Sequence, residues 1–104
     1  MEHQIEFDSE KAACNFNVHK VLFEDAALVF VDPMRLERRD DSESNASGEE
    51  RWQTLGKVAK VLFVVYTERG DKTRIISART ATKAEKRSYY GHDNNNSKRW
   101  AKAD

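Results

Sequence analysis

The chain has 104 residues, enough for one domain with a modest core, and 35% of them are charged, with Lys and Arg balancing Asp and Glu. The charges are unevenly placed: residues 1–68 carry eight Lys and Arg against fourteen Asp and Glu, whereas residues 69–104 carry ten against four. A polar N-terminus and the lack of a long apolar run exclude a signal peptide and a membrane span, which predicts a cytoplasmic protein. The one cysteine, Cys14, excludes an internal disulfide and is predicted to be a small core residue.

The first half of the chain predicts one short strand and two helices. Ile5 and Phe7 alternate with polar residues as in a strand, and Asp8 can cap a helix that runs to about Asn17. The apolar face of this helix would consist of Ala12, Ala13 and Phe16. A second short helix is predicted from Glu24 to about Phe30, and Asp32-Pro33 ends it.

Four strands and a helix are predicted after this point. Residues 34–39 are the first strand, residues 40–50 are an acidic loop, and residues 51–57 alternate as the second. Two apolar strands follow, joined by Gly70-Asp71, which is typical of a type II′ hairpin turn. A two-residue turn makes Arg69 face Lys72 and Thr67 face Arg74. Thr82 and Glu85 then form a capping-box pattern at the start of a helix.

This order, strand, helix, helix, four strands, helix, predicts an α+β domain in which helices flank a small antiparallel sheet. One face of the sheet is expected to be core, and the other to be open to solvent or a partner. We assign residues 1–90 to this domain. Residues 91–104 are low in apolar content and are predicted to be a disordered tail, apart from a possible anchor at Trp100. Truncation after Tyr90 is therefore expected to change stability very little.

The last two long strands and the last helix concentrate cations on an ordered scaffold. Such a scaffold is a candidate anion-binding surface, and nucleic acid is the expected anion. Ordinary solvated charge remains the alternative, because charge counting alone cannot reject it. The cations are Arg69, Arg74, Arg79, Lys83, Lys86 and Arg87.

Several motifs together resemble the BrnT toxins. They are FDxxKAxxN from Phe7, FEDAALVF from Phe23, EERWxxLG from Glu49, VVYTERG from Val64 and RIISARxATxxEKRxY from Arg74. The resemblance runs from about Phe7 to Tyr90 and implies a fold similar to RelE-type toxins. It also implies a ribonuclease of a type II toxin–antitoxin module. The implied partner is a BrnA antitoxin with a ribbon-helix-helix domain, through which the complex would bind operator DNA and repress its own operon.

The resemblance and the charges together suggest the site residues. His19 is the one histidine away from the chain ends and is a candidate proton carrier, although it could equally hydrogen-bond a backbone carbonyl. Arginines suit the charge of a phosphorane, so we expect a phosphate clamp on the shared motifs. The predicted catalytic residues are His19, Arg51, Arg69 and Arg79. The predicted RNA-binding residues are Lys57, Arg74, Lys83, Lys86, Arg87 and Tyr89.

Some features of the predicted site leave alternatives open. The hairpin register puts Arg69 and Arg74 on one face and Arg79 on the other, unless Arg79 lies past the end of the strand, where alternation lapses. Glu85 is explained by its capping role, and Tyr89 or Tyr90 could pack on the sheet instead of stacking on bases. The chain also departs from the family at Val18-His19-Lys20, where Lys-His-Gly is common.

Two functions are consistent with these observations. The first is a metal-independent ribonuclease toxin, since no residue spacing predicts a metal site and no cofactor is expected. The second is a catalytically degenerate module that acts only as a binding partner of a DNA-binding antitoxin. In either case, Arg38, which belongs to the acidic half, is expected to be dispensable.

Overall fold

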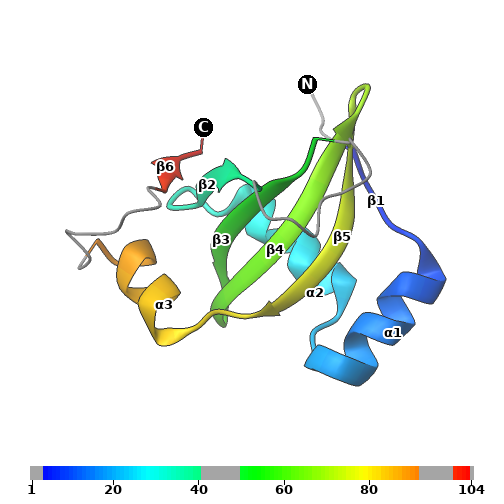
Figure 1. The fold of residues 1–104 in the computed structure, drawn as a ribbon, viewed down its shortest axis with the longest axis horizontal. Helices are drawn as coiled ribbons and strands as arrows, with labels where there is room; N and C mark the ends of the chain where they lie inside the picture. Colours follow the sequence, from blue (N-terminus) through cyan, green and yellow to red (C-terminus); the bar gives the residue numbers. More distant parts are fainter. Residues whose placement is uncertain (1–3, 41–49, 92–99, 104) are drawn as a thin grey trace.

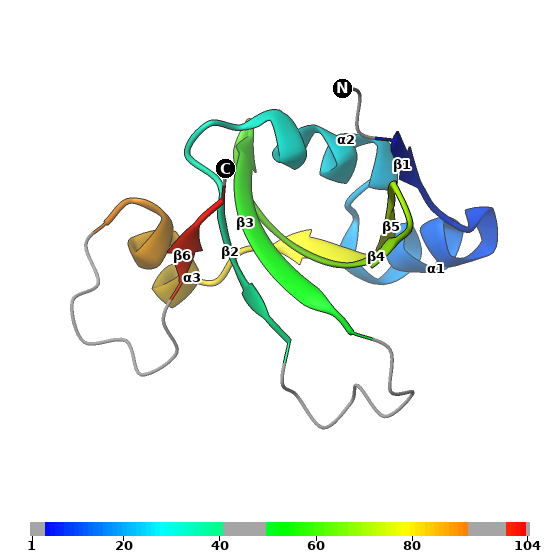
Figure 2. The same cartoon turned by 90° about the horizontal axis from the view of Figure 1, so that it is seen from above.

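The computed structural model describes residues 4–40, 50–91 and 100–103, which form a curved six-stranded sheet with helices on both faces (Figures 1 and 2). The strands are β1 (Gln4–Glu6), β2 (Leu36–Arg39), β3 (Trp52–Val58), β4 (Lys60–Arg69), β5 (Lys72–Thr80) and β6 (Ala101–Lys102). The helices are α1 (Ser9–His19), α2 (Phe23–Ala27), the 3₁₀ helix η1 (Leu28–Val31) and α3 (Lys83–Tyr89). None of the described helices is long and apolar enough to cross a membrane.

The strand order is β1-β5-β4-β3-β2-β6, which confirms the predicted α+β class. The prediction of a purely antiparallel sheet is wrong at one edge, because β1 pairs in parallel with β5 through Ile5 and Thr73. Two strands that are joined by a short connection are expected to pair antiparallel. This rule makes no prediction for β1 and β5, because they are far apart in the sequence. The acidic loop predicted over residues 40–50 lies, for residues 41–49, outside the described part of the chain.

The β4–β5 hairpin has the predicted turn and register near its tip. Gly70 has a φ of 64°, which a glycine adopts without strain, and the Arg69–Lys72 and Thr67–Arg74 pairs are both present. Further down, Tyr66 pairs with Ile75 while Val65 pairs with Ser77. Ile76 is therefore an extra residue in β5, and the resulting β-bulge reverses the side-chain alternation beyond it.

Helices α1, α2 and η1 cover one face of the sheet and enclose the main core. Phe23, Ala26 and Val29 are fully buried there against Val64 and the other inward residues of β4 and β5. Asp8 caps α1 as predicted, accepting a hydrogen bond from the Glu10 backbone N–H. The contact between η1 and β3 is so close that a Cβ on Gly56 would lie 2.5 Å from the Cβ of Val29, so this position requires glycine.

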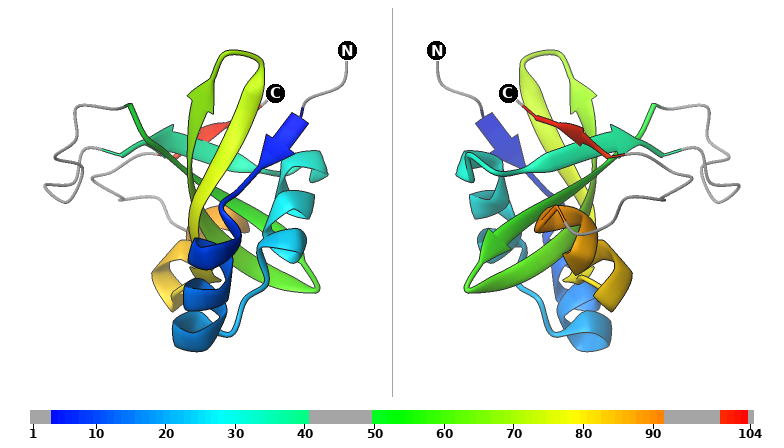
Figure 3. Two further views of the ribbon diagram at one scale, coloured as in Figure 1. Left: turned by 90° about the vertical axis from the view of Figure 1, so that its right-hand side faces the viewer. Right: turned by 90° about the vertical axis from the view of Figure 1, so that its left-hand side faces the viewer.

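Helix α1 contacts the sheet in a way that was not predicted. Its one buried residue is Asn15, whereas Phe16 is 41% exposed and Cys14 is exposed, so the prediction that Cys14 is a core residue is wrong. The Asn15 amide donates to the Ala78 carbonyl (2.9 Å) and accepts from the Ala78 N–H (3.1 Å), as a neighbouring strand would. In this way α1 protects the edge of β5 below the end of β1 (Figure 3).

The opposite face is covered at one end only, by α3 and the end of the chain (Figure 2). Helix α3 begins with the predicted capping box, in which Thr82 and Glu85 bond each other's backbone N–H groups. The tail was predicted to be disordered apart from an anchor at Trp100. Trp100 does pack on the sheet, but Ala101 and Lys102 are also ordered, since they pair with β2. The rest of the predicted tail, residues 92–99 and 104, lies outside the described residues.

Candidate functional site

Four arginines share one face of the sheet, and the bulge at Ile76 places Arg79 among them. Arg74 pairs with Thr67 and Arg79 pairs with Phe63, and Thr67 and Phe63 share a face of β4 because they are four residues apart. Arg38, on β2, pairs with Gln53, which pairs with Val65 of the same face. The prediction that Arg79 lies opposite Arg74 is therefore wrong, since regular alternation fails at the bulge. Arg69, two residues from Thr67 on β4, also lies on this face, and we call the face that carries Arg38, Arg69, Arg74 and Arg79 the arginine face.

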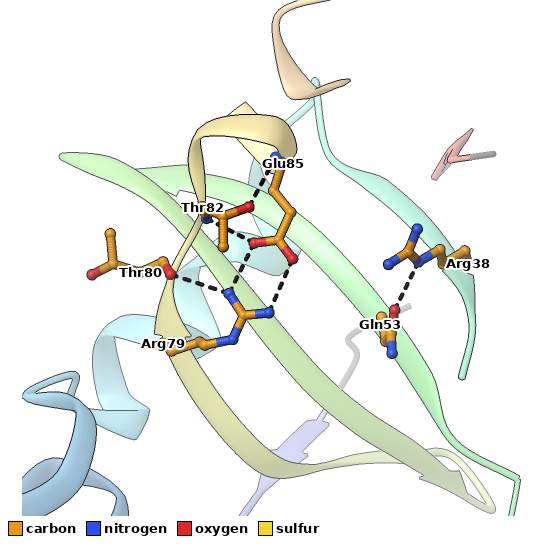
Figure 4. Close-up of polar contacts among 6 residues, drawn as sticks. All are labelled: Arg38, Gln53, Arg79, Thr80, Thr82 and Glu85. Atoms are coloured by element: carbon orange, nitrogen blue, oxygen red, sulfur yellow. Dashed lines mark hydrogen bonds and ion pairs between the residues drawn. The ribbon is translucent and has the colours of Figure 1, made fainter. Parts of the chain in front are cut away.

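Arg79 is held in a bidentate ion pair with Glu85. Its Nη1 lies 2.8 Å from Oε1 and its Nη2 lies 2.9 Å from Oε2 (Figure 4). Its Cζ lies 3.9 Å from the centre of the Phe63 ring. Burial alone would raise the pKa of Glu85, but hydrogen bonds from Arg79 and Thr82 hold it below its ordinary value. Glu85 therefore stays ionised near neutral pH and fixes the plane of the Arg79 guanidinium.

Arg38 extends toward the same pair from the other side of the face (Figure 4). Its Nε donates to Gln53 Oε1 at 2.7 Å, and the Gln53 amide donates to the buried carboxylate of Asp40. Burial lowers the pKa of Arg38, and Arg79 lowers it further, while Glu85 and Asp40 raise it. This mutual influence shows that Arg38, Arg79 and Glu85 form one electrostatic cluster, although the guanidinium remains protonated.

A pair of aromatic rings joins the two arginines. Phe63 and Trp100 meet edge to face with ring centres 6.2 Å apart, and the Arg38 Cζ lies 3.9 Å above the Trp100 ring. Each arginine is thus stacked on one ring of the pair. Such stacking fixes the orientation of a guanidinium.

The other predicted arginines lie away from the Arg79–Glu85 pair. Arg74 bonds Glu6 of β1 at 3.2 Å. Arg69 lies near the hairpin tip, six residues along β4 from Phe63, which corresponds to roughly 20 Å. Arg51 lies just before β3, and its Nε is buried without a hydrogen-bond partner among the described residues. The structure therefore does not bring Arg51, Arg69 and Arg79 together around one phosphate.

His19 lies at the exposed end of α1. It lines a shallow hollow of about 230 Å³, together with Lys11, Cys14, Asn15, Val18 and Ile76. Among the described residues, none of the predicted arginines lines this hollow. His19 is nevertheless tied to the sheet near Arg79, because Asn15, one helical turn earlier, bonds Ala78.

The predicted RNA-binding residues of α3 divide into two groups. Lys83, Lys86 and Arg87 are exposed, and exposed Lys57 of β3 lies 5.6 Å from the centre of the Tyr90 ring. Tyr89 is not free to stack on a base, because it packs against the Leu55 cluster and its hydroxyl donates to Asp32 Oδ2 at 2.6 Å. Burial, followed by the Asp32 hydrogen bond, raises the pKa of Tyr89.

Sequence reasoning missed Arg38 and Trp100 as members of this cluster. Arg38 belongs to the acidic half of the chain, and charge counting hides it. Side-chain alternation along β2 and β3 can place Arg38 on the same face as Gln53. The sequence around these residues, however, does not indicate that both lie beside Arg79. In the described part of the chain, no three His, Cys, Asp or Glu side chains come close enough to hold a metal ion.

The geometry suits the binding of an oxyanion. A guanidinium has a second edge, formed by Nε and Nη2, after its Nη1–Nη2 edge has been used. In Arg79 the Nη1–Nη2 edge holds Glu85, and the Nε–H makes no hydrogen bond to any described residue. A phosphate bound to that edge would lie on the same face of the sheet as Arg38, which points toward the Arg79–Glu85 pair.

The model of the family described as ribonuclease toxin, BrnT, of type II toxin–antitoxin system matches residues 7–85. The chain belongs to the BrnT family. It also resembles the 1.1 Å crystal structure of the Brucella abortus ribonuclease toxin BrnT, with a TM-score of 0.58 and 19% identity. The match covers 79% of this chain and 100% of that one, and at this identity it shows the fold alone. No curated protein matches the chain.

Arg38, Arg79 and Glu85 lie inside the segment that matches the BrnT family, whereas Trp100 lies outside it. Lys20, in the Val18-His19-Lys20 segment that departs from the BrnT resemblance, is the C-cap residue of α1. Lys20 has a φ of 61°, in the left-handed region that glycine adopts without strain. The backbone therefore takes a glycine-type conformation here, although the residue is lysine.

Proposed function

We propose that this BrnT family member is a cytoplasmic endoribonuclease toxin that cleaves RNA on the arginine face without a metal ion. The observation that carries the proposal is the Arg79–Glu85 pair, with Arg38 directed toward it across the same face. Two guanidiniums that are already oriented can neutralise the scissile phosphate without reorganising during the reaction.

In the proposed reaction the 2′-oxygen of the RNA attacks the adjacent phosphorus and the bond from phosphorus to the 5′-oxygen breaks. The 2′-hydroxyl proton passes to a base, the leaving oxygen gains a proton, and the products end in a 2′,3′-cyclic phosphate and a 5′-hydroxyl. Arg79 and Arg38 stabilise the extra charge of the phosphorane. Glu85 acts as a positioning residue, because its carboxylate fixes the guanidinium of Arg79.

His19 is the proposed proton carrier. Its imidazole is exposed, and Asn15 fastens its helix to the residue that precedes Arg79. The remaining cations would guide the RNA backbone toward the site rather than take part in the chemistry. They are Arg51, Lys57, Arg69, Arg74, Lys83, Lys86 and Arg87.

Metal independence is proposed because the described residues offer cations where a metal site would need carboxylates. The proposed inhibitor is a BrnA-like ribbon-helix-helix antitoxin, through which the complex would bind operator DNA and regulate its own operon. A segment that covers the arginine face should be acidic or amphipathic, and its binding should weaken as salt screens the exposed charges.

The test is incubation of the purified protein with a single-stranded RNA in EDTA, with identification of the product ends. We expect cleavage in EDTA and ends that carry a cyclic phosphate. Loss of cleavage in EDTA with recovery on adding Mg²⁺ would contradict the proposal. Absence of cleavage under both conditions, combined with tight binding of an antitoxin encoded by an adjacent gene, would favour the degenerate binding module instead.

A further inference from the structure

Trp100 differs from the rest of the site in its position in the sequence and in its exposure to solvent. It lies beyond residues 7–85, the segment that matches the family, yet it completes the aromatic pair between the two arginines. Phe63 is 7% exposed and already carries Arg79, so its ring cannot receive a ligand. Trp100 is only partly buried.

The position of Trp100 is fixed by the backbone that follows it. Ala101 pairs with Glu37 and Lys102 pairs with Leu36, and the N–H of Ala103 donates to the Arg35 carbonyl at 2.9 Å. The indole is thus attached to the edge of the sheet next to β2, the strand that carries Arg38. The backbone of the fold therefore places Trp100 beside the strand that carries Arg38.

Arg38 is held over the indole by two contacts. Its Cζ is 3.9 Å from the Trp100 ring centre and its Nε bonds Gln53. Unpaired RNA bases stack on aromatic rings such as indole and on the planes of arginine guanidiniums. Here they form one stacked unit beside the place proposed for the phosphate.

We propose that Arg38 and Trp100 form a platform on which a base next to the scissile phosphate stacks, so that the toxin selects single-stranded RNA. This inference rests on the proposed ribonuclease function, because it takes the Arg79 edge as the phosphate position. A base in a duplex is already stacked and paired, so it cannot reach the platform without being unstacked. Trp100 is then a specificity-determining residue that the family-matched segment does not contain.

The experiment measures equilibrium binding of two fluorescently labelled 2′-O-methyl oligonucleotides of six residues, which cannot be cleaved because the nucleophile is blocked. One is oligoadenylate, and the other has the same backbone with its central bases removed. The proteins compared are the native chain, Trp100→Ala, Trp100→Phe and Arg38→Lys, each with its melting temperature recorded. Arg38→Lys keeps the charge but loses the planar surface.

We expect Trp100→Ala to weaken binding of oligoadenylate on the order of tenfold and binding of the abasic probe much less. Trp100→Phe should keep most of the affinity, whereas Arg38→Lys should resemble Trp100→Ala. In a Trp52→Phe variant, whose one tryptophan is Trp100, oligoadenylate should quench the fluorescence more than the abasic probe does. Trp52 pairs with Tyr66 on the opposite face of the sheet and is the natural control.

Equal weakening of both probes by Trp100→Ala, or no weakening of either, would overturn the platform and leave the ribonuclease proposal standing. Tighter binding by Trp100→Ala would also overturn it, since the indole would then obstruct the site. Failure of the native protein to bind either probe, together with failure to cleave RNA in EDTA, would overturn both proposals.

Discussion

The charged side chains of the arginine face are paired before any substrate arrives. Arg79 is fixed by Glu85, and Arg38 is fixed by Gln53 and the Trp100 ring, so neither has to lose much conformational freedom on binding phosphate. Preorganised donors of this kind contribute more to a transition state than mobile surface cations do. The site thus consists of a few fixed guanidiniums within a larger basic surface.

Arg38 and its neighbour Arg39 provide a matched test of this account. Arg38 lies on the arginine face, whereas Arg39 is 59% exposed and is directed to the other face, since it pairs with Trp52. We expect Arg38→Glu to slow RNA cleavage by roughly 10²-fold or more, because it removes a donor and adds a repelling charge. Arg39→Glu should leave the rate within about twofold, as surface substitutions usually do.

This expectation replaces the one drawn from the sequence, which made Arg38 dispensable because it lies in the acidic half. The comparison is made from single-turnover rates on one RNA, with thermal melting as a check on folding. Equal loss of rate in both variants would show that total positive charge matters and that the specific geometry does not.

The ionised state of Glu85 makes the stability of the site depend on pH. Its pKa is lowered in the folded protein, so the stabilisation is fully present above the ordinary value of 4.5 and is lost as pH falls through the folded pKa. Glu85→Gln should therefore be less stable than the native protein at pH 7, and the difference should shrink in this acidic range. Urea unfolding of both proteins at several pH values measures it, and a difference that stays constant with pH would contradict the assignment.

Among the secondary-structure elements, β5 and α1 determine where the site residues lie. The bulge in β5 places Arg79 on the same face as Phe63. Asn15 of α1 forms a hydrogen bond with Ala78, the residue that precedes Arg79. Asn15→Ala should leave a buried N–H and a buried C=O of Ala78 without partners, at a cost of roughly 1–3 kcal/mol in the free energy of unfolding.

Asn17, exposed on the same helix, is the control for this substitution. Asn17→Ala should change the free energy of unfolding by less than about 0.5 kcal/mol. If chemical denaturation gives equal stabilities for the two variants, Asn15 does not have the edge-pairing role that its hydrogen bonds indicate.

These two elements also show how far the sequence leads. The turn at Gly70-Asp71, the register near it and the capping box of Thr82 and Glu85 depend on local chemistry, and all three were predicted. The bulge at Ile76 and the burial of Asn15 depend on contacts with distant segments, and the local pattern instead favours regular alternation and an apolar helix face. Because the position of Arg79 depends on the bulge, the sequence could identify the arginine but not its face.

At the scale of the whole molecule, Trp100 and β6 bring residues late in the sequence into contact with the site. Deletion of residues 91–104 would remove Trp100 from Phe63 and Arg38 and would uncover the edge of β2. We expect a loss of roughly 1–2 kcal/mol, from the burial of part of an indole and its ring contacts. For a domain of this size, that corresponds to a fall of several degrees in melting temperature. An unchanged melting temperature would support the sequence expectation that the tail is dispensable.

The central claim is that Arg79 contacts the scissile phosphate on the arginine face. The most direct test is the single-turnover rate of RNA cleavage in EDTA by the native protein, Arg79→Ala and Arg79→Lys. Both variants should be slower by roughly 10²- to 10³-fold, because lysine keeps the charge but cannot hold Glu85 and a phosphate on two edges. Cleavage by either folded variant at a rate close to that of the native protein would contradict the claim.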